Sequence, residues 1–187
     1  MNVQEATTRR LPDLKERHLP ENCRETINTI LKETYGYEQF RNLEIYDDLS
    51  KGKEKLCISQ GQLIENVILE AEKAWKSETQ VDNILLTAPT GSGKSLLFQL
   101  PAIYLGKEYN LLTIVVSPLK ALIVDQVESL QELGYARVAY ASSDLSPEQK
   151  MEVYRQVREG EIDLFYLSPA LLLSYDYMNF VGERRFG

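Results

Sequence analysis

A glycine-rich loop between a predicted strand and a predicted helix constrains this chain more than any other feature. Residues 88–95 read Ala-Pro-Thr-Gly-Ser-Gly-Lys-Ser, with an apolar run at 83–87 before them and another at 96–100 after them. A strand that leads through such a loop into a helix aims backbone N–H groups at an anion. Glycine also lets the backbone approach phosphate oxygens closely. We therefore expect a phosphate-binding loop here rather than a turn that binds nothing.

The residue types in this loop have separate expected roles in binding a nucleotide. Lys94 is expected to reach the β- and γ-phosphates, and the Ser95 hydroxyl to bind Mg²⁺. These two are the predicted catalytic residues, and Ser95 is the predicted metal ligand. The predicted contacts to the nucleotide and its metal are Thr90, Gly91, Ser92, Gly93, Lys94, Ser95 and Leu96.

Short apolar runs alternate with helical stretches from the loop onward. The predicted strands are 83–88, 111–117, 136–141 and 162–167, and the predicted helices are 94–105, 119–133, 147–159 and 169–175. This alternation is typical of βαβ units, which form a parallel sheet with helices on both faces. Pro101 is expected to bend or break the first of these helices, because proline lacks the N–H that a helix needs. The predicted fold class is α/β.

The N-terminal region is predicted to be mainly helical. One helix is expected to end at Gly36, and helical periodicity returns from Gln62. The polar stretch 46–61 between them, rich in lysine and glycine, is predicted to be a linker or exposed loop. We therefore predict an accessory segment over 1–60, followed by a nucleotide-binding domain over 61–187.

The composition narrows the classes of protein that fit. A net charge of −7 argues against a surface coated with nucleic acid but permits a narrow binding track. No apolar run approaches the roughly 20 residues that span a bilayer, and the N-terminus lacks the apolar stretch of a secretory signal. Two cysteines and one histidine are too few for a disulfide framework or a histidine metal site. We expect a cytoplasmic or nucleoid-associated protein with no membrane partner. The basic residues of 9–24 fit a solvated face better than a binding patch, and both readings stay open.

Short polar turns follow the predicted strands, at the edge where parallel α/β sheets bind ligands. They hold the predicted nucleic-acid contacts Ser117, Pro118, Lys120, Ser142 and Ser168. Hydroxyl groups and helix N-termini suit a phosphate backbone, and a lysine adds a counter-charge. A serine before a proline is also a good helix cap, so capping and phosphate binding both stay open.

Four segments of the chain resemble the RecQ-like group of superfamily-two helicases. Residues 88–102 resemble motif I, 116–127 resemble motif Ia with its Asp-Gln-Val, 142–161 are RecQ-like, and 163–169 are similar to motif Ib. The resemblance implies part of a RecA-like P-loop domain that binds ATP and Mg²⁺ against a second such domain, which is missing from this chain. It also implies that motifs Ia and Ib hold single-stranded or partially duplex DNA.

The family places an adenine-reading glutamine upstream of motif I. Its preceding pattern fits residues 35–41, Tyr-Gly-Tyr-Glu-Gln-Phe-Arg, but Glu44 stands at the expected glutamine position. A Gly-Gln pair occurs later, at Gly61 and Gln62, and an insertion would explain the separation. We favour Gln62 as the adenine reader, and the alternative of an ordinary residue at a helix start stays open.

Two further departures from the family bear on activity. Ala170 follows the motif Ib proline, where the family usually has a glutamate, and no Asp-Glu-x-His segment (motif II) follows Ser168. The carboxylates of that segment organise Mg²⁺ and orient the attacking water. We therefore expect the chain to be part of a longer helicase, cut before motif II, and to lack significant ATPase activity by itself.

Two other functions stay open. Another superfamily-two motor, such as an RNA helicase or a restriction-type translocase, would use the same loop. RNA helicases of the Asp-Glu-Ala-Asp type usually have Pro-Thr-Arg-Glu-Leu where residues 117–122 read Ser-Pro-Leu-Lys-Ala-Leu, which weakens that reading. A non-catalytic nucleotide-binding module, in which residues 1–60 dock a partner, is the remaining alternative.

Overall fold

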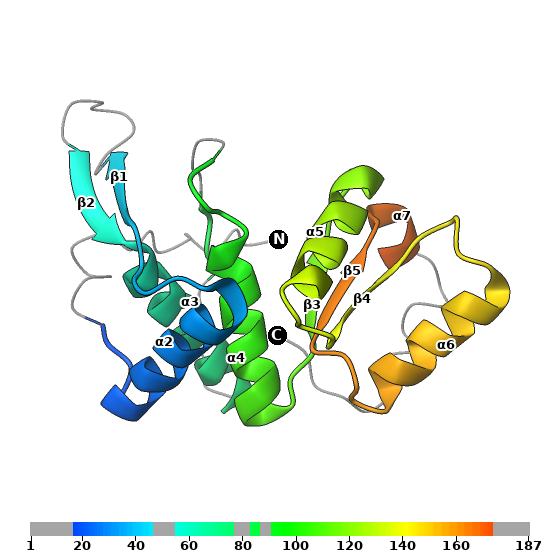
Figure 1. Ribbon diagram of the computed structural model, residues 1–187, viewed down its shortest axis with the longest axis horizontal. Helices are drawn as coiled ribbons and strands as arrows, with labels where there is room; N and C mark the ends of the chain where they lie inside the picture. Colours follow the sequence, from blue (N-terminus) through cyan, green and yellow to red (C-terminus); the bar gives the residue numbers. More distant parts are fainter. Residues whose placement is uncertain (1–16, 47–54, 77–82, 87–90, 174–187) are drawn as a thin grey trace, which may run out of the picture. The chain divides into compact units, whose positions relative to one another are not determined.

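The chain forms two compact units, which are described separately. A computed structural model describes residues 17–46, 55–76, 83–86 and 91–173. The first unit comprises Met1–Thr29 and Tyr37–Pro101, and the second comprises Ile30–Gly36 and Ala102–Gly187. Figure 1 shows their helices and strands in chain order. The domain boundary expected at residue 60 stays a prediction.

In the N-terminal region, one helix ends at a residue suited to a helix end, and the next begins after a residue suited to a helix start. Helix α2 (Glu21–Tyr35) ends, as predicted, at Gly36, which has a φ of +69° and donates its N–H to the Lys32 carbonyl at 3.0 Å. Glycine adopts this left-handed conformation at the least cost. Helix α3 (Gln60–Trp75) begins after Ser59, whose hydroxyl accepts the Gly61 N–H at 3.1 Å. It therefore starts two residues earlier than predicted.

Part of the stretch predicted to be a linker, 46–61, is the second strand of an antiparallel hairpin, and its residues 47–54 lie outside the described residues. Strand β1 (Asn42–Tyr46) pairs with strand β2 (Lys55–Ser59), with Asn42 opposite Ser59 and Tyr46 opposite Lys55 (Figure 1). The linker prediction was wrong over 55–61, because the polar composition around the hairpin connection concealed two strands of five residues each.

The region around the phosphate loop departs from prediction on both sides. Of the strand predicted over 83–88, residues 83–86 form no strand and are exposed, Leu85 by 91%, and residues 87–88 lie outside the described part of the chain. An apolar run becomes a strand only when another strand completes its ladder, and 83–86 belong to neither sheet. Helix α4 (Leu96–Tyr109) continues through Pro101, so of the two predicted outcomes the break was wrong and the bend stays a prediction. Residues 100–106 are all buried, and this packing holds the helix together across the missing hydrogen bond.

A three-stranded parallel sheet organises the second unit. Its strands are β3 (Thr113–Val116), β4 (Val138–Ala141) and β5 (Leu164–Leu167), in the spatial order β3-β5-β4. Three of the predicted strands and the α/β class are thereby confirmed. The central strand, β5, is buried along its whole length, as expected for a strand covered on both faces.

Helices lie on both sides of this sheet (Figure 1). They are α5 (Lys120–Glu132), α6 (Pro147–Arg158) and α7 (Pro169–Leu172). The face under α6 and α7 has a buried core of Leu112, Ala139, Ala141, Val157, Ile162, Phe165 and Leu167. Helix α5 covers the other face with Ile123, Val127 and Leu130. In the described part of the chain, no helix is both long and apolar enough to cross a membrane.

Candidate nucleotide site and nucleic-acid edge

The phosphate loop has the backbone conformation that its glycines were expected to allow. Gly91 has a φ of +80° and Gly93 a φ of +76°, both in the left-handed region that side chains with a Cβ disfavour. The loop leads directly into α4, where the Leu97 N–H donates to the Lys94 carbonyl at 3.0 Å. The start of a helix directs backbone N–H groups and positive partial charge toward an anion. Thr90, also predicted as a contact, lies outside the described residues.

A glutamine that the sequence analysis missed lies against this loop. The Gln60 side chain is 3% exposed; its Nε2 donates to the Ser92 carbonyl at 3.1 Å, and its Oε1 accepts the Arg41 N–H at 3.1 Å. A Cβ added to Gly93 would come within 2.6 Å of Gln60 Nε2. The amide of Gln60 therefore braces the loop at a point where only glycine fits.

The residues around Gln60 place it under the loop. The Gln60 N–H donates to the Arg41 carbonyl at 2.9 Å, which closes the base of the β1–β2 hairpin. The Phe40 ring packs so closely on Gly61 that a Cβ there would lie 2.6 Å from Phe40 Cδ2. Ser59 was the signal in the sequence that could have revealed this arrangement, because a capping serine there makes Gln60 the first residue of α3.

Gln62, the predicted adenine reader, has different neighbours. Its Nε2 donates to the Arg17 carbonyl at 2.8 Å. The same side of α3 holds Arg17 through an ion pair with Glu70 at 2.7 Å, and Glu65 accepts the Leu19 N–H at 3.0 Å. Gln62 thus ties α3 to the segment that precedes α2, and its role toward adenine stays a prediction.

Side chains of the loop fit a phosphate group. Ser92 Oγ is buried, and among the described residues no hydrogen-bond partner lies within reach of it. A buried hydroxyl without a partner is unfavourable unless a ligand or water satisfies it. Lys94 is exposed at the end of the loop, and Ser95 is half-buried. Leu96 begins α4 and is buried in the core, so it could contact a ligand only through its backbone.

In the second unit, the strand register aligns three predicted contacts along the carboxyl edge of the sheet. Val116, Leu167 and Ala141 are mutual partners across β3, β5 and β4. The next residue of each strand is a serine, so Ser117, Ser168 and Ser142 form a row across this edge. Neighbouring strands lie about 4.8 Å apart, and the row therefore spans roughly 10 Å.

The serines of this row also shape the turns in which they lie. The Ser168 hydroxyl caps α7 by accepting the Leu171 N–H at 3.3 Å, and the Ser117 hydroxyl accepts the Leu119 N–H at 3.4 Å. Ser142 is buried, whereas Pro118 and Lys120, which follow β3 at the same edge, are exposed. Capping at Ser168 is confirmed, and a hydroxyl that accepts one hydrogen bond still has its own proton to donate.

The opposite edge of the sheet carries an ion pair with a buried carboxylate that the sequence analysis missed. Asp163 is 2% exposed and accepts hydrogen bonds from Arg137 Nε at 2.6 Å and from the Tyr135 hydroxyl at 2.7 Å. Burial, together with the Asp163 carboxylate, raises the pKa of Tyr135. A Cβ on Gly106 would lie 2.3 Å from Asp163 Cγ, so the carboxylate packs directly on the α4 backbone. This network anchors the amino ends of β4 and β5 and belongs to the scaffold.

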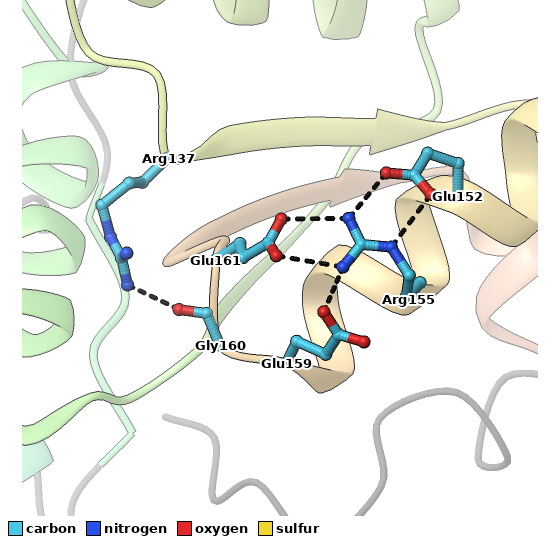
Figure 2. A network of polar contacts seen from close by, with 6 residues as sticks. All are labelled: Arg137, Glu152, Arg155, Glu159, Gly160 and Glu161. Atoms are coloured by element: carbon cyan, nitrogen blue, oxygen red, sulfur yellow. Dashed lines mark hydrogen bonds and ion pairs between the residues drawn. The ribbon is translucent and has the colours of Figure 1, made fainter.

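The connection from α6 to β5 extends the polar contacts of that edge. Figure 2 shows Arg137 donating to the Gly160 carbonyl and Arg155 bound by three glutamates of α6 and its end. The glutamates are Glu152, Glu159 and Glu161. Hydrogen bonding to these carboxylates raises the pKa of Arg155. Exposed ion pairs of this kind stabilise a fold only slightly.

Comparison with known proteins assigns the fold to a family. Residues 68–184 match a family model described as DEAD/DEAH box helicase. The chain belongs to this helicase family. A solved structure of the helicase MrfA bound to DNA has the same fold over 88% of this chain and 20% of its own, with a TM-score of 0.54 and 21% identity. The expected partial RecA-like domain is confirmed.

Curated relatives of the chain confirm its resemblance to the RecQ-like group. The ATP-dependent DNA helicase RecQ of Synechocystis is 33% identical over 86% of the chain, and that of Bacillus subtilis is 31% identical over 80%. The ATP-dependent DNA helicase Q-like 5 of Arabidopsis thaliana is 30% identical over 83%. The matched region covers 27%, 20% and 13% of these three proteins, respectively.

Proposed function

We propose that this chain carries the ATP-binding part of a DNA helicase motor, in which ATP binding and hydrolysis drive movement along single-stranded DNA and duplex unwinding. The observation that carries the proposal is the phosphate loop, with two left-handed glycines and the buried, unpartnered hydroxyl of Ser92 at the start of α4. Membership of the DEAD/DEAH box helicase family supports a motor. The RecQ relatives are ATP-dependent DNA helicases, which supports DNA as the track of the motor.

ATP and Mg²⁺ are the proposed ligands of the loop. A bound magnesium ion would neutralise phosphate charge and assist phosphoryl transfer as a Lewis acid. In this proposal the Ser92 hydroxyl donates to a phosphate oxygen, Lys94 supplies a positive charge and Ser95 offers its hydroxyl to the metal. Hydrolysis requires the carboxylates of motif II and a second RecA-like domain, so we expect residues 1–187 to bind ATP without turning it over.

Two glutamines have separate proposed roles in this site. Gln60 uses both amide atoms on the protein, on Ser92 and on Arg41, and we assign it the role of holding the loop in shape. Gln62 stays the proposed adenine reader, and its Nε2 would have to leave the Arg17 carbonyl to contact a base. Substitutions of the two glutamines are therefore expected to affect nucleotide preference differently.

The row of Ser117, Ser142 and Ser168 is the proposed contact surface for the DNA backbone. Hydroxyl groups and helix starts at the carboxyl edge of a parallel sheet suit phosphate oxygens, which carry no sequence information. Pro118 would shape the turn, and Lys120 would provide the counter-charge. A sequence-independent track of this kind is what a motor that moves along DNA requires.

Titration calorimetry of ATP with Mg²⁺ tests the nucleotide site. Lys94→Ala is expected to weaken ATP binding by about 10- to 100-fold, because it removes a charge-assisted contact to phosphate. Lys107→Ala is the matched control, since it also removes an exposed charge, from the last turn of α4. Equal ATP affinities of the Lys94→Ala variant and the unaltered chain would overturn the proposal. Preference for an RNA oligonucleotide over DNA of the same sequence would favour an RNA helicase instead.

A further inference from the structure

Lys120 is the sole positively charged side chain in the turns at the carboxyl edge of the sheet. These turns are residues 117–120, 142–149 and 168–172, and their remaining charged residues are Asp144 and Glu148. Within these turns a phosphate backbone therefore meets two anions and a single cation, and the next cation along the chain is Lys150 in α6. Since neutralisation by cations supplies most non-specific affinity for nucleic acid, the state of Lys120 decides how well the edge binds.

The Lys120 ammonium is already paired within the chain. It forms an ion pair with Asp144 Oδ2, on the turn that follows β4. The two side chains are 44% and 66% exposed, so a phosphate in solution can reach both of them. Exposed ion pairs are weak, and a competing anion can replace one partner without unfolding the protein.

Asp144 also engages the serines of its own turn. Its backbone N–H donates to Ser142 Oγ at 3.4 Å, and its Oδ1 accepts the Ser143 hydroxyl at 3.4 Å. One acidic residue thus contacts the cation and two hydroxyl groups at the same time. The carboxylate itself contacts the Lys120 ammonium and the Ser143 hydroxyl, and Lys120 is the cation that a phosphate on this edge would use.

We propose that the Asp144 carboxylate mimics a phosphate group. It pairs with the Lys120 ammonium until a DNA phosphate displaces it. The inference rests on the proposed function, because it requires this edge to bind the DNA backbone. Carboxylate and phosphate oxygens both accept charge-assisted hydrogen bonds from an ammonium group, so the exchange leaves Lys120 paired throughout. Because a phosphate must first displace Asp144, a single phosphate contact with Lys120 contributes less binding free energy. A DNA strand that also contacts the serine row offsets this loss. The pairing of Asp144 with Lys120 therefore favours a continuous strand over an isolated anion.

Binding of a fluorescein-labelled oligo-dT strand to the full 187-residue chain, followed by fluorescence anisotropy at low salt, tests this inference. Asp144→Asn is expected to tighten DNA binding by about two- to five-fold, because DNA phosphate no longer competes with the Asp144 carboxylate for Lys120. This range corresponds to the free energy of an exposed ion pair. The matched control is Glu148→Gln. It removes the same charge from the same edge, but Glu148 accepts from the Ser146 hydroxyl rather than from Lys120. Its effect on affinity should be clearly smaller.

A second pair of variants isolates the contact between the two residues. In a Lys120→Ala background, Asp144→Asn should have no more effect than Glu148→Gln, because no ion pair is left to release. Asp144→Ser serves as an independent removal of the carboxylate, and circular dichroism verifies that each variant is folded. The advantage of Asp144→Asn should shrink as salt rises, since screening weakens an exposed pair.

The possible results separate this inference from the proposed function. If Lys120→Ala weakens DNA binding while Asp144→Asn and Glu148→Gln behave alike, the inference is wrong and the DNA-binding edge remains. An effect of Asp144→Asn that persists without Lys120 also overturns the inference, because it reflects net charge alone. If no variant binds DNA at low salt, both the inference and the proposed DNA contact fail.

Discussion

Substitution of Gly93 by alanine tests whether the Gln60 brace positions the phosphate loop. Two obstacles meet an alanine at this position: the left-handed backbone, with its φ of +76°, and the Gln60 amide, 2.6 Å from the new Cβ. Gly91 provides a matched comparison. Its φ of +80° is nearly the same, but apart from its two chain neighbours no atom of the described residues lies within 4 Å of an added Cβ. Only Gly93→Ala must displace a neighbouring side chain.

The expected difference between the two substitutions follows from these contacts. Both incur the left-handed conformation, which costs about 1–2 kcal/mol for a residue with a Cβ. In Gly93→Ala the Gln60 amide must also move and give up its hydrogen bonds to the Ser92 carbonyl and the Arg41 N–H. Each such bond contributes about 1 kcal/mol, so Gly93→Ala should cost about 2 kcal/mol more than Gly91→Ala. This corresponds to roughly 30-fold in ATP affinity if the loss falls on the ligand-binding conformation.

Calorimetric titration with ATP and Mg²⁺ measures this difference directly. A Gln60→Ala background supplies the control, because alanine there leaves space for the Cβ at position 93. In that background the two glycine substitutions should weaken ATP binding equally. Equal ATP affinities of Gly91→Ala and Gly93→Ala in the unaltered background would show that Gln60 does not hold the phosphate loop in its binding conformation. A difference between them that persists in the Gln60→Ala background would show the same.

Two further predictions concern the base of the nucleotide and the scaffold. Gln62→Ala should reduce the preference for ATP over GTP, whereas Gln60→Ala should weaken the binding of both nucleotides alike. Competitive titration measures this preference. A changed preference in Gln60→Ala would reverse the roles assigned to the two glutamines. Because burial and the Asp163 carboxylate raise the pKa of Tyr135, the stability it contributes is fully present below pH 10, the ordinary tyrosine pKa, and is lost above it. Denaturant unfolding between about pH 8 and about pH 11 should therefore show a smaller fall in the free energy of unfolding for Tyr135→Phe than for Tyr37→Phe or the unaltered chain. An equal fall would contradict this.

The elements of the second unit could be predicted because local signals define them. Buried apolar runs mark β3 to β5, and each predicted strand there lies within two residues of the observed one. The start of α6 follows from Ser146 and Gln149, which form a capping box with the Gln149 N–H 3.2 Å from the serine hydroxyl. The glycines of the phosphate loop are equally local, since a left-handed backbone at Gly91 and Gly93 follows from the motif itself.

The features that escaped prediction depend on partners far away in the sequence. Gln60 contacts a residue 32 positions later, and Asp163 pairs with a residue 26 positions earlier. Neither contact leaves a periodic pattern, so a single glutamine or aspartate gives no sign of it. The failure at 83–86 has a related cause, because an apolar run shows strand propensity but not whether a neighbouring strand completes its ladder.

The closed base of the β1–β2 hairpin has a consequence for how chains of this kind diverge. The Arg41 and Gln60 backbones are joined by a hydrogen bond of 2.9 Å, so the 18 residues between them leave and return at one point. A segment whose ends already touch can lengthen or shrink at little cost, since the entropy of closing a loop grows only slowly with its length. Insertions at this point need not disturb Phe40, Arg41 or Gln60. Sequence spacing between these residues is therefore a poor guide to relatedness here, whereas their meeting beneath the loop is a good one.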